Sequence, residues 1–154
     1  NTLMIMSRSW AQENNAADQM NSASNLRQIG QGMLMYANEN EGKYPPDFKT
    51  LLATQGLTED VLHSPFSENP AGEDMVYLYF EGMDTTLNAQ VVVAFDGAAL
   101  LSEGGTNSLY GDGHVDWQTL EGFRSALETS RKADPRSAAI APNTPASRML
   151  GDAP

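Results

Sequence analysis

Three ionisable side chains alternate within one short stretch of the sequence. Asp112, His114 and Asp116 stand two residues apart, and alternate residues of a β-strand share one face. Carboxylate oxygens and imidazole nitrogens are ligands that divalent metals use in proteins. On an extended strand the three positions span about 13 Å, however, which works against convergence on one ion. Two interpretations stay open: a metal site, or turn chemistry in which Asp112 shapes a turn beside Gly113.

A predicted β-hairpin positions these residues. Apolar and aromatic segments flank a Gly-Asp-Gly turn that begins at Gly111, and such residues favour tight turns. A three-residue loop places Leu109 opposite Val115 on one face, whereas a two-residue loop would pair Leu109 with Asp116 and mix the faces. The pattern therefore predicts a three-residue turn with Gly113 in the left-handed conformation.

Other patterns for metal binding or catalysis are weak. Asn38, Asn40 and Gly42 alternate as in the first half of a calcium loop, but Lys49 stands where such a loop needs its glutamate. The chain has two histidines, no cysteine and no motif that would activate a nucleophile. We therefore expect a protein that is not an enzyme, with a metal-dependent hydrolase built on His114 as a rival hypothesis.

The charge and composition of the chain argue against several classes of binding partner. The 154 residues carry a formal net charge of -11, which argues against nucleic acid and against electrostatic docking on anionic lipid. Without cysteine, disulfides and zinc–thiolate sites are excluded. No stretch of this sequence approaches the roughly 18 apolar residues of a membrane span.

The first forty residues predict one long helix, from about Leu3 to Asn40. Such a helix would be roughly 55 Å long, which exceeds the diameter of a domain of this size. Its second half has an apolar stripe, and the spacing of Met20, Met33, Met35 and Tyr36 predicts core positions. Its first half is mostly polar, so we expect it to protrude, fray or pair with another chain.

The remaining sequence predicts an α+β fold, with the long helix packed on a small antiparallel sheet of three to five strands. Asp47 and Gly56 bound a short helix, and a turn is predicted at Asp96. The other predicted elements are strands at 75–80 and 90–95 and a helix at 119–130. The chain divides into a protruding helix half (1–22), a globular domain (23–132) and a tail rich in Ala, Pro and Ser (133–154).

Two phrases of the sequence resemble a known family. One is SNLRQIGQ followed by YANENEGKYPP, at 24–31 and 36–46, and the other is GGTNSLYGDGHVDW at 104–117. Together they are similar to the helix exit and the C-terminal hairpin of type IV pilin-like proteins and type II secretion pseudopilins. The similarity is greatest to the prepilin family of planctomycete-type bacteria that has a DGHV hairpin.

This resemblance implies a pilin-like fold and a structural role in the cell envelope, periplasmic or extracellular. The full-length form would be anchored in the inner membrane by a segment before residue 1, and its partners would be copies of itself or other pilin-like subunits. A membrane-anchored binding module that uses a pilin-type export signal without forming a filament is the alternative.

The predicted assembly interface is the first half of the helix. Its apolar and small residues have no expected partner within the chain: Leu3, Met4, Met6, Trp10, Ala17 and Met20. Some pseudopilins bind calcium in a late loop, so the resemblance also implies loop oxygens as calcium ligands, although ordinary turn and cap roles are the simpler interpretation. The oxygens available are those of Asp84, Asn88, Asp96 and Glu103.

Overall fold

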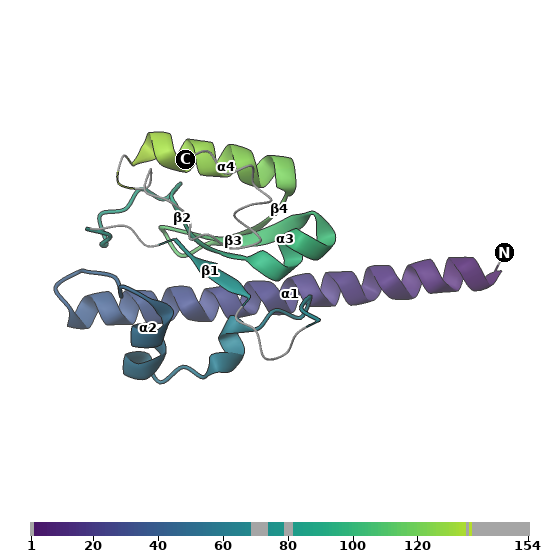
Figure 1. Cartoon of the computed structure of the whole chain (residues 1–154), viewed down its shortest axis with the longest axis horizontal. Coiled ribbons are helices and arrows are strands. Elements are labelled where there is room, and N and C mark those ends of the chain that lie inside the picture. The colour runs from purple at the N-terminus through teal and green to yellow at the C-terminus, as the bar shows by residue number, and fades with distance from the viewer. Residues whose placement is uncertain (1, 69–73, 79–81, 135, 137–154) are drawn as a thin grey trace.

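The long helix packs on a four-stranded antiparallel sheet, so the predicted α+β fold class is confirmed (Figure 1). The computed structural model describes residues 2–68, 74–78, 82–134 and 136, and it describes the side chains of the first helix from Asn15 onward. Within the described residues, no helix is long and apolar enough to cross a membrane.

Helix α1 runs from Thr2 to Glu39 and has 38 residues. At about 1.5 Å per residue it is roughly 57 Å long, and its N-terminal part projects beyond the rest of the molecule (Figure 1). The helix ends where the Gly42 amide donates to the Ala37 carbonyl at 2.8 Å, with Gly42 at a φ of 83°. Glycine adopts this left-handed conformation without the strain of a Cβ atom.

One face of α1 is buried against the sheet. Leu26, Ile29, Met33 and Ala37 recur at steps of three and four and are almost fully buried, which follows from about 100° of rotation per residue. Met35 lies outside this arc and is 54% exposed, so the predicted core position is wrong there.

The sheet has the strand order β1-β2-β3-β4, with every neighbouring pair antiparallel. Strand β1 is shorter than the predicted 75–80, of which 79–80 lie outside the described residues. The strands are β1 (Met75–Tyr77), β2 (Val92–Asp96), β3 (Gly105–Tyr110) and β4 (Val115–Thr119).

Local capping signals account for three shorter helices. The Asp47 side chain accepts from the Thr50 amide at the start of α2 (Phe48–Gln55), and Gly56 ends that helix, as predicted. A 3-10 helix, η1 (Glu59–Leu62), follows. Helix α4 (Leu120–Ala133) starts at Thr119, whose hydroxyl accepts from the Gly122 amide.

Helix α3 (Gly97–Glu103) is a correction to the predicted turn at Asp96. The Asp96 carboxylate accepts from the Ala99 amide at 3.1 Å and caps this helix. The cap directs the chain from β2 into a helical connection that leads to β3. The same residue types favour tight turns and helix N-caps, so the sequence alone could not distinguish a turn from a helix start at Asp96.

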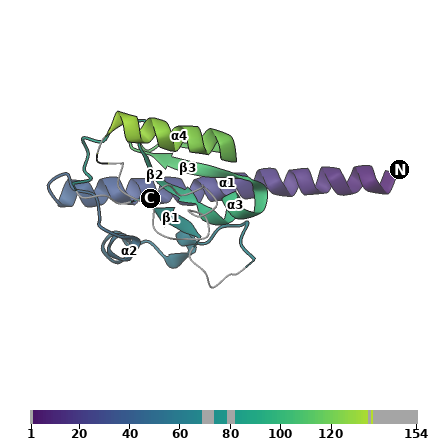
Figure 2. The same ribbon diagram turned by 45° about the horizontal axis from the view of Figure 1, so that its top comes forward.

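The sheet separates two hydrophobic clusters and so forms the middle of three layers (Figure 1 and, turned by 45°, Figure 2). On one side, α1 and α2 pack on residues that include Val93 and Leu109. On the other side, α4 contributes Phe123, whose ring lies 4.8 Å from that of Phe95, centroid to centroid. Both faces of the sheet are therefore covered by helices.

Candidate assembly site on the long helix and the hairpin turn

The hairpin between β3 and β4 has the predicted three-residue turn. Leu109 pairs with Val115, and the Tyr110 amide donates to the His114 carbonyl at 3.0 Å. Gly113 has a φ of 90°, so it occupies the left-handed region that favours glycine. The register is confirmed because only this loop keeps apolar side chains on the buried face.

The turn fixes Asp112 and His114 against each other. The Asp112 carboxylate accepts from the His114 amide at 3.1 Å and contacts its Nδ1, and the imidazole stacks on Tyr110 with ring centroids 4.4 Å apart. Partial burial works to raise the pKa of Asp112, but the hydrogen bonds from His114 outweigh it, so the pKa lies below its ordinary value. This pair is consistent with the turn-chemistry interpretation.

The three predicted metal ligands do not come together as a site. Asp116 lies on β4 opposite Ser108, beyond the Asp112–His114 pair. In the described part of the chain, no group of three or more His, Cys, Asp or Glu side chains is placed to hold a metal ion. The reason is geometric: positions along one strand spread, while the stack on Tyr110 holds the imidazole at the turn.

The predicted calcium oxygens are also dispersed, and each already has a protein partner. The Asn88 side chain accepts from the Gln90 amide, Glu103 accepts from Asn15, and Asp96 is buried. Asp84 accepts from Thr86 and contacts Arg136. Their hydrogen bonds shape turns and connections, in agreement with the simpler interpretation.

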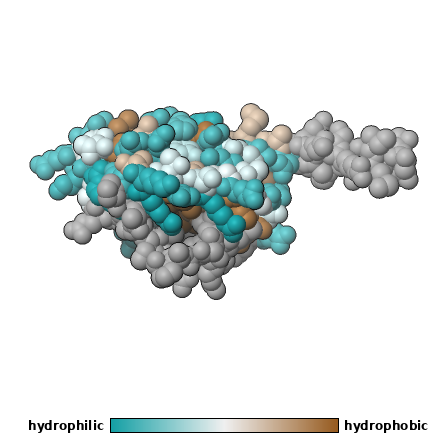
Figure 3. Space-filling model, turned by 90° about the horizontal axis from the view of Figure 1, so that it is seen from above, coloured by the Kyte–Doolittle hydropathy of each residue, from teal (hydrophilic) through white to brown (hydrophobic). Residues whose placement is uncertain are grey.

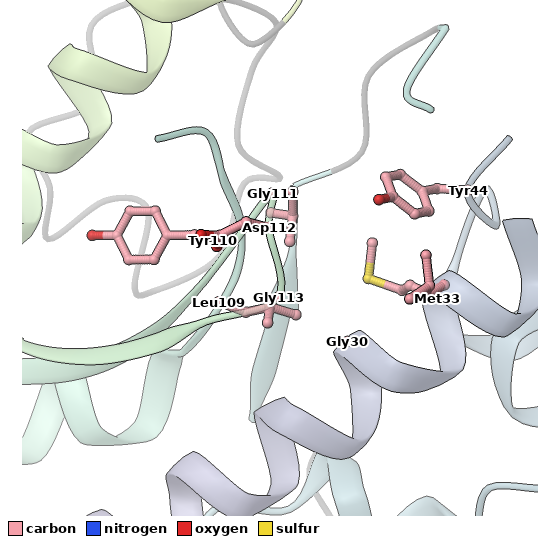
Figure 4. A pocket seen from close by; sticks show the side chains of 10 residues that line it. Gly30, Met33, Tyr44, Leu109, Tyr110, Gly111, Asp112 and Gly113 are labelled. Carbon is pink, nitrogen blue, oxygen red and sulfur yellow. The ribbon is translucent and has the colours of Figure 1, made fainter. Parts of the chain in front are cut away.

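The two phrases that carry the family resemblance meet at one small cavity between α1 and the hairpin turn (Figure 4). Gly30 and Met33 line it from the helix, Tyr44 from the helix exit, and Leu109 and Gly111 from the hairpin. Its volume is about 70 Å³, well below the roughly 300–1,000 Å³ of small-molecule sites. The cavity can take the tip of a side chain but not an ordinary metabolite.

Two glycines allow the close approach of chain segments around this cavity. A Cβ atom on Gly30 would stand 3.0 Å from Leu109 Cδ1, and one on Gly111 would stand 2.5 Å from the Asn88 carbonyl oxygen. Gly30, which weakens a helix by about 1 kcal/mol relative to alanine, therefore lets α1 lie directly on β3. Gly111 similarly lets the hairpin turn contact the loop before β2.

Polar side chains hold α1 to the sheet layer before its apolar stripe begins. Asn15 donates to Glu103 at 2.9 Å, and Asn107 of β3 donates to the Gln19 carbonyl at 2.8 Å. Ser22 is fully buried. The boundary expected between 22 and 23 thus lies inside the contact region, because Asn15, Gln19 and Ser22 already contact the globular layer.

Asp96 is the centre of this polar contact. It is fully buried, and its Oδ2 accepts hydrogen bonds from the hydroxyls of Ser22 and Ser64, each at 2.6 Å. Burial raises the pKa of Asp96, while the hydrogen bonds from Ser22, Ser64 and the Ala99 amide act against the rise. One carboxyl group therefore ties α1, the segment before β1 and the start of α3 together.

The outward face of α1 carries the exposed part of the predicted assembly interface. Ala17 is exposed and Met20 is 72% exposed, so Met20 is not a core residue. Leu34, at 52%, is a further exposed apolar residue of α1. Figure 3, seen from the side of α4, shows that the described surface of that face is mainly hydrophilic. Four predicted residues lie on α1 where side chains are outside the described set: Leu3, Met4, Met6 and Trp10.

Arg136, which was expected to lie in the tail, contacts the globular unit. Its guanidinium donates to both oxygens of Asp134, to the Gly82 carbonyl at 2.7 Å and to Asp84 at 3.4 Å. The globular unit therefore extends past residue 132 to Arg136. A single arginine between two aspartates separated by 50 positions gives no local sequence pattern that would have revealed it.

Replacing Arg136 by methionine is expected to raise the pKa of Asp134. The hydrogen bond from Arg136 is the largest cause that holds this pKa below its ordinary value. The stabilisation from this pair is present above the ordinary pKa, near 4, and is lost as pH falls through the lowered value. Carboxyl titration by NMR measures the change, with Arg131→Met on exposed α4 as the control. An unchanged Asp134 titration in Arg136→Met would contradict the assignment.

Comparisons with protein-family models, with curated proteins and with solved structures find no match to this chain.

Proposed function

We propose that this chain is the extracytoplasmic part of a pilin-like subunit that assembles through α1. The observation that carries the proposal is a 38-residue helix whose N-terminal part projects beyond the globular layer (Figure 1). An isolated helix end gains little from propensity alone and is stabilised by packing on a partner. The projecting part is the segment that a neighbouring subunit would cover.

The surface chemistry of the described residues supports the same role. The cavity beside the hairpin is too small for a metabolite, and Asp112 and His114 contact each other and Tyr110. Met20, 72% exposed on α1, is accessible for a contact with a neighbouring subunit. By its resemblance, the subunit belongs to a secretion or pilus system of the cell envelope, with an inner-membrane anchor.

Replacing Met20 by glutamate is expected to disrupt multimers of the full-length protein. The change puts a charge into the proposed interface, where it would be desolvated without a partner, but it leaves the fold intact because Met20 is exposed. Sedimentation and electron microscopy of the membrane-extracted protein measure assembly. Ser125→Glu on the exposed surface of α4 is the matched control.

Two experimental outcomes would contradict assembly through α1. Full-length protein that stays monomeric at all concentrations would favour a membrane-anchored binding module, the alternative function. Multimers that survive Met20→Glu but are lost in Ser125→Glu would move the interface from α1 to α4.

A further inference from the structure

Arg136 fixes the start of the C-terminal segment 137–154 beside the cavity between α1 and the hairpin turn. The guanidinium of Arg136 donates to the Gly82 carbonyl at 2.7 Å. Met83, the neighbour of Gly82, accepts a hydrogen bond from the Tyr44 amide at 3.1 Å, and Tyr44 lines the cavity. The segment is therefore anchored one residue away from a direct partner of the cavity wall.

The end of α4 brings the chain to the same side of the sheet as this cavity. Phe123, near the start of α4, belongs to the hydrophobic cluster on the α4 side, whereas Ala133, its last residue, packs on the cluster on the α1 side. Asp84 is an ion-pair partner of Arg136. Burial raises the pKa of Tyr44, and the nearby charge of Asp84 raises it further. Arg136 and the cavity wall therefore share a close neighbour.

The cavity offers an apolar space of the size of a side-chain tip. Met33 and Tyr44 lie on one side of it, and the hairpin turn lies on the other (Figure 4). Leu34, which also lines it, is 52% exposed. Its volume of about 70 Å³ is roughly two waters' share of the liquid, but a water needs two to four polar partners. A mostly apolar lining therefore suits an aliphatic side chain better than water.

From this arrangement we infer that the side chain of Ile140 docks in this cavity and that residues 137–141 form a strap across its opening. Ile140 is the first large apolar residue after Arg136, and only Ser and Ala stand between them. Four positions of extended chain reach about 13 Å at most. That reach exceeds the roughly 5 Å between bridged segments such as those of Lys43 and Asp84.

A tethered segment has an advantage over any separate molecule as the occupant of the cavity. A short tether gives an effective concentration in the millimolar range, whereas a second copy of a chain with a net charge of -11 is repelled. Met149 and Leu150 are the other large apolar residues of the segment, and they stand nine and ten positions beyond Ile140. Their longer tether lowers their effective concentration, so Ile140 is the favoured occupant.

The strap adds a contact that the described contacts of α1 lack. The docked side chain would touch Leu34 of α1 and the hairpin turn together, and it would remove apolar surface of Leu34 from water. The strap is a contact within one subunit, so the inference does not depend on the proposed function.

Cysteine crosslinking tests this contact in the full-length protein, since this chain has no cysteine of its own. Leu34→Cys/Ile140→Cys is expected to form an intramolecular disulfide roughly ten-fold faster than Leu101→Cys/Ile140→Cys. Leu101 is the matched control, because it lies on α3 and is 49% exposed, against 52% for Leu34. Equal rates in the two pairs overturn the inference, and so does a disulfide that joins two copies, which a non-reducing gel shows as a dimer.

Urea unfolding provides a second readout without cysteines. Ile140→Ser is expected to lower the urea midpoint, because the cavity loses its apolar occupant, while Met149→Ser is expected to leave the midpoint unchanged. A midpoint that does not move in Ile140→Ser overturns the inference. A midpoint that falls only in Met149→Ser also overturns it and assigns the cavity to the later part of the segment.

Discussion

Replacing Asp96 by alanine is expected to lower the free energy of unfolding by about 3–5 kcal/mol. The substitution removes the acceptor of two buried hydroxyls, those of Ser22 and Ser64, and the N-cap of α3. Each hydroxyl loses its hydrogen bond to Oδ2 in a place that is closed to solvent, since both serines are buried. Urea unfolding followed by circular dichroism measures the loss.

Asp96→Asn is the matched variant, because it keeps the size of the side chain and its acceptor for the Ala99 amide while removing the charge. Hydroxyl groups can donate or accept, so Ser22 and Ser64 can still pair with the amide. We expect Asp96→Asn to retain most of the stability that Asp96→Ala loses. Equal losses in the two variants would contradict the hydrogen-bond assignment.

The comparison of the wild type with Asp96→Asn also predicts the direction in which the unfolding free energy changes with pH. Burial raises the pKa of Asp96 in the folded protein, so the folded state binds its proton more tightly than the unfolded state. The contribution of Asp96 to stability is therefore full below the unfolded pKa, near 4, and declines as pH rises through the raised folded value. The difference in unfolding free energy between wild type and Asp96→Asn should follow this decline, and a flat difference would refute it.

Gly111→Ala is expected to destabilise the fold by about 3 kcal/mol. The added Cβ would stand 2.5 Å from the Asn88 carbonyl oxygen, and the obstacle is backbone, which cannot rotate away as a side chain can. The shift needed to relieve this overlap would also strain the hydrogen bond from the Gly111 amide to the Val91 carbonyl, at 2.8 Å. Overpacking and a weakened buried hydrogen bond together give the stated magnitude.

Gly122→Ala in α4 is the control for the glycine prediction. Its added Cβ would approach nothing closer than Thr119 Oγ1, at 3.4 Å, and alanine is the better helix former by about 1 kcal/mol. We expect this variant to be as stable as the wild type or slightly more stable in the same urea titration. A Gly111→Ala loss below about 1 kcal/mol would mean that the loop at Asn88 yields easily.

The interface prediction could be made only in part from the sequence. The apolar residues of the interface could be recognised because they lie on the mostly polar first half of a long predicted helix without Pro. That half has no evident packing partner in its own chain. The polar contacts of Asn15 and Asn107 were missed, since polar side chains are ordinarily solvent-facing. Asn15 pairs with Glu103, 88 positions away, and no local sequence pattern predicts such a contact.

Local sequence signals were sufficient to predict the elements that depend on only a few neighbouring residues. Asp47 and Gly56 bounded α2, and the Gly-Asp-Gly turn gave the hairpin its register, because caps and turns depend on backbone conformation at single positions. The α+β class and the long α1 followed from hydrophobic period and length.

Which face of α1 is covered, and which contacts Asp96 makes, depend on the packing of segments that are distant in the sequence. Met20 and Met33 are of one residue type on one helix, yet Met33 is buried and Met20 exposed, because the sheet meets only one side of α1. Asp96 is a helix cap by its local sequence, but Ser22, 74 positions earlier, makes it a buried link between layers. Burial depends on which distant segments the fold brings together, and that information is spread over the whole chain.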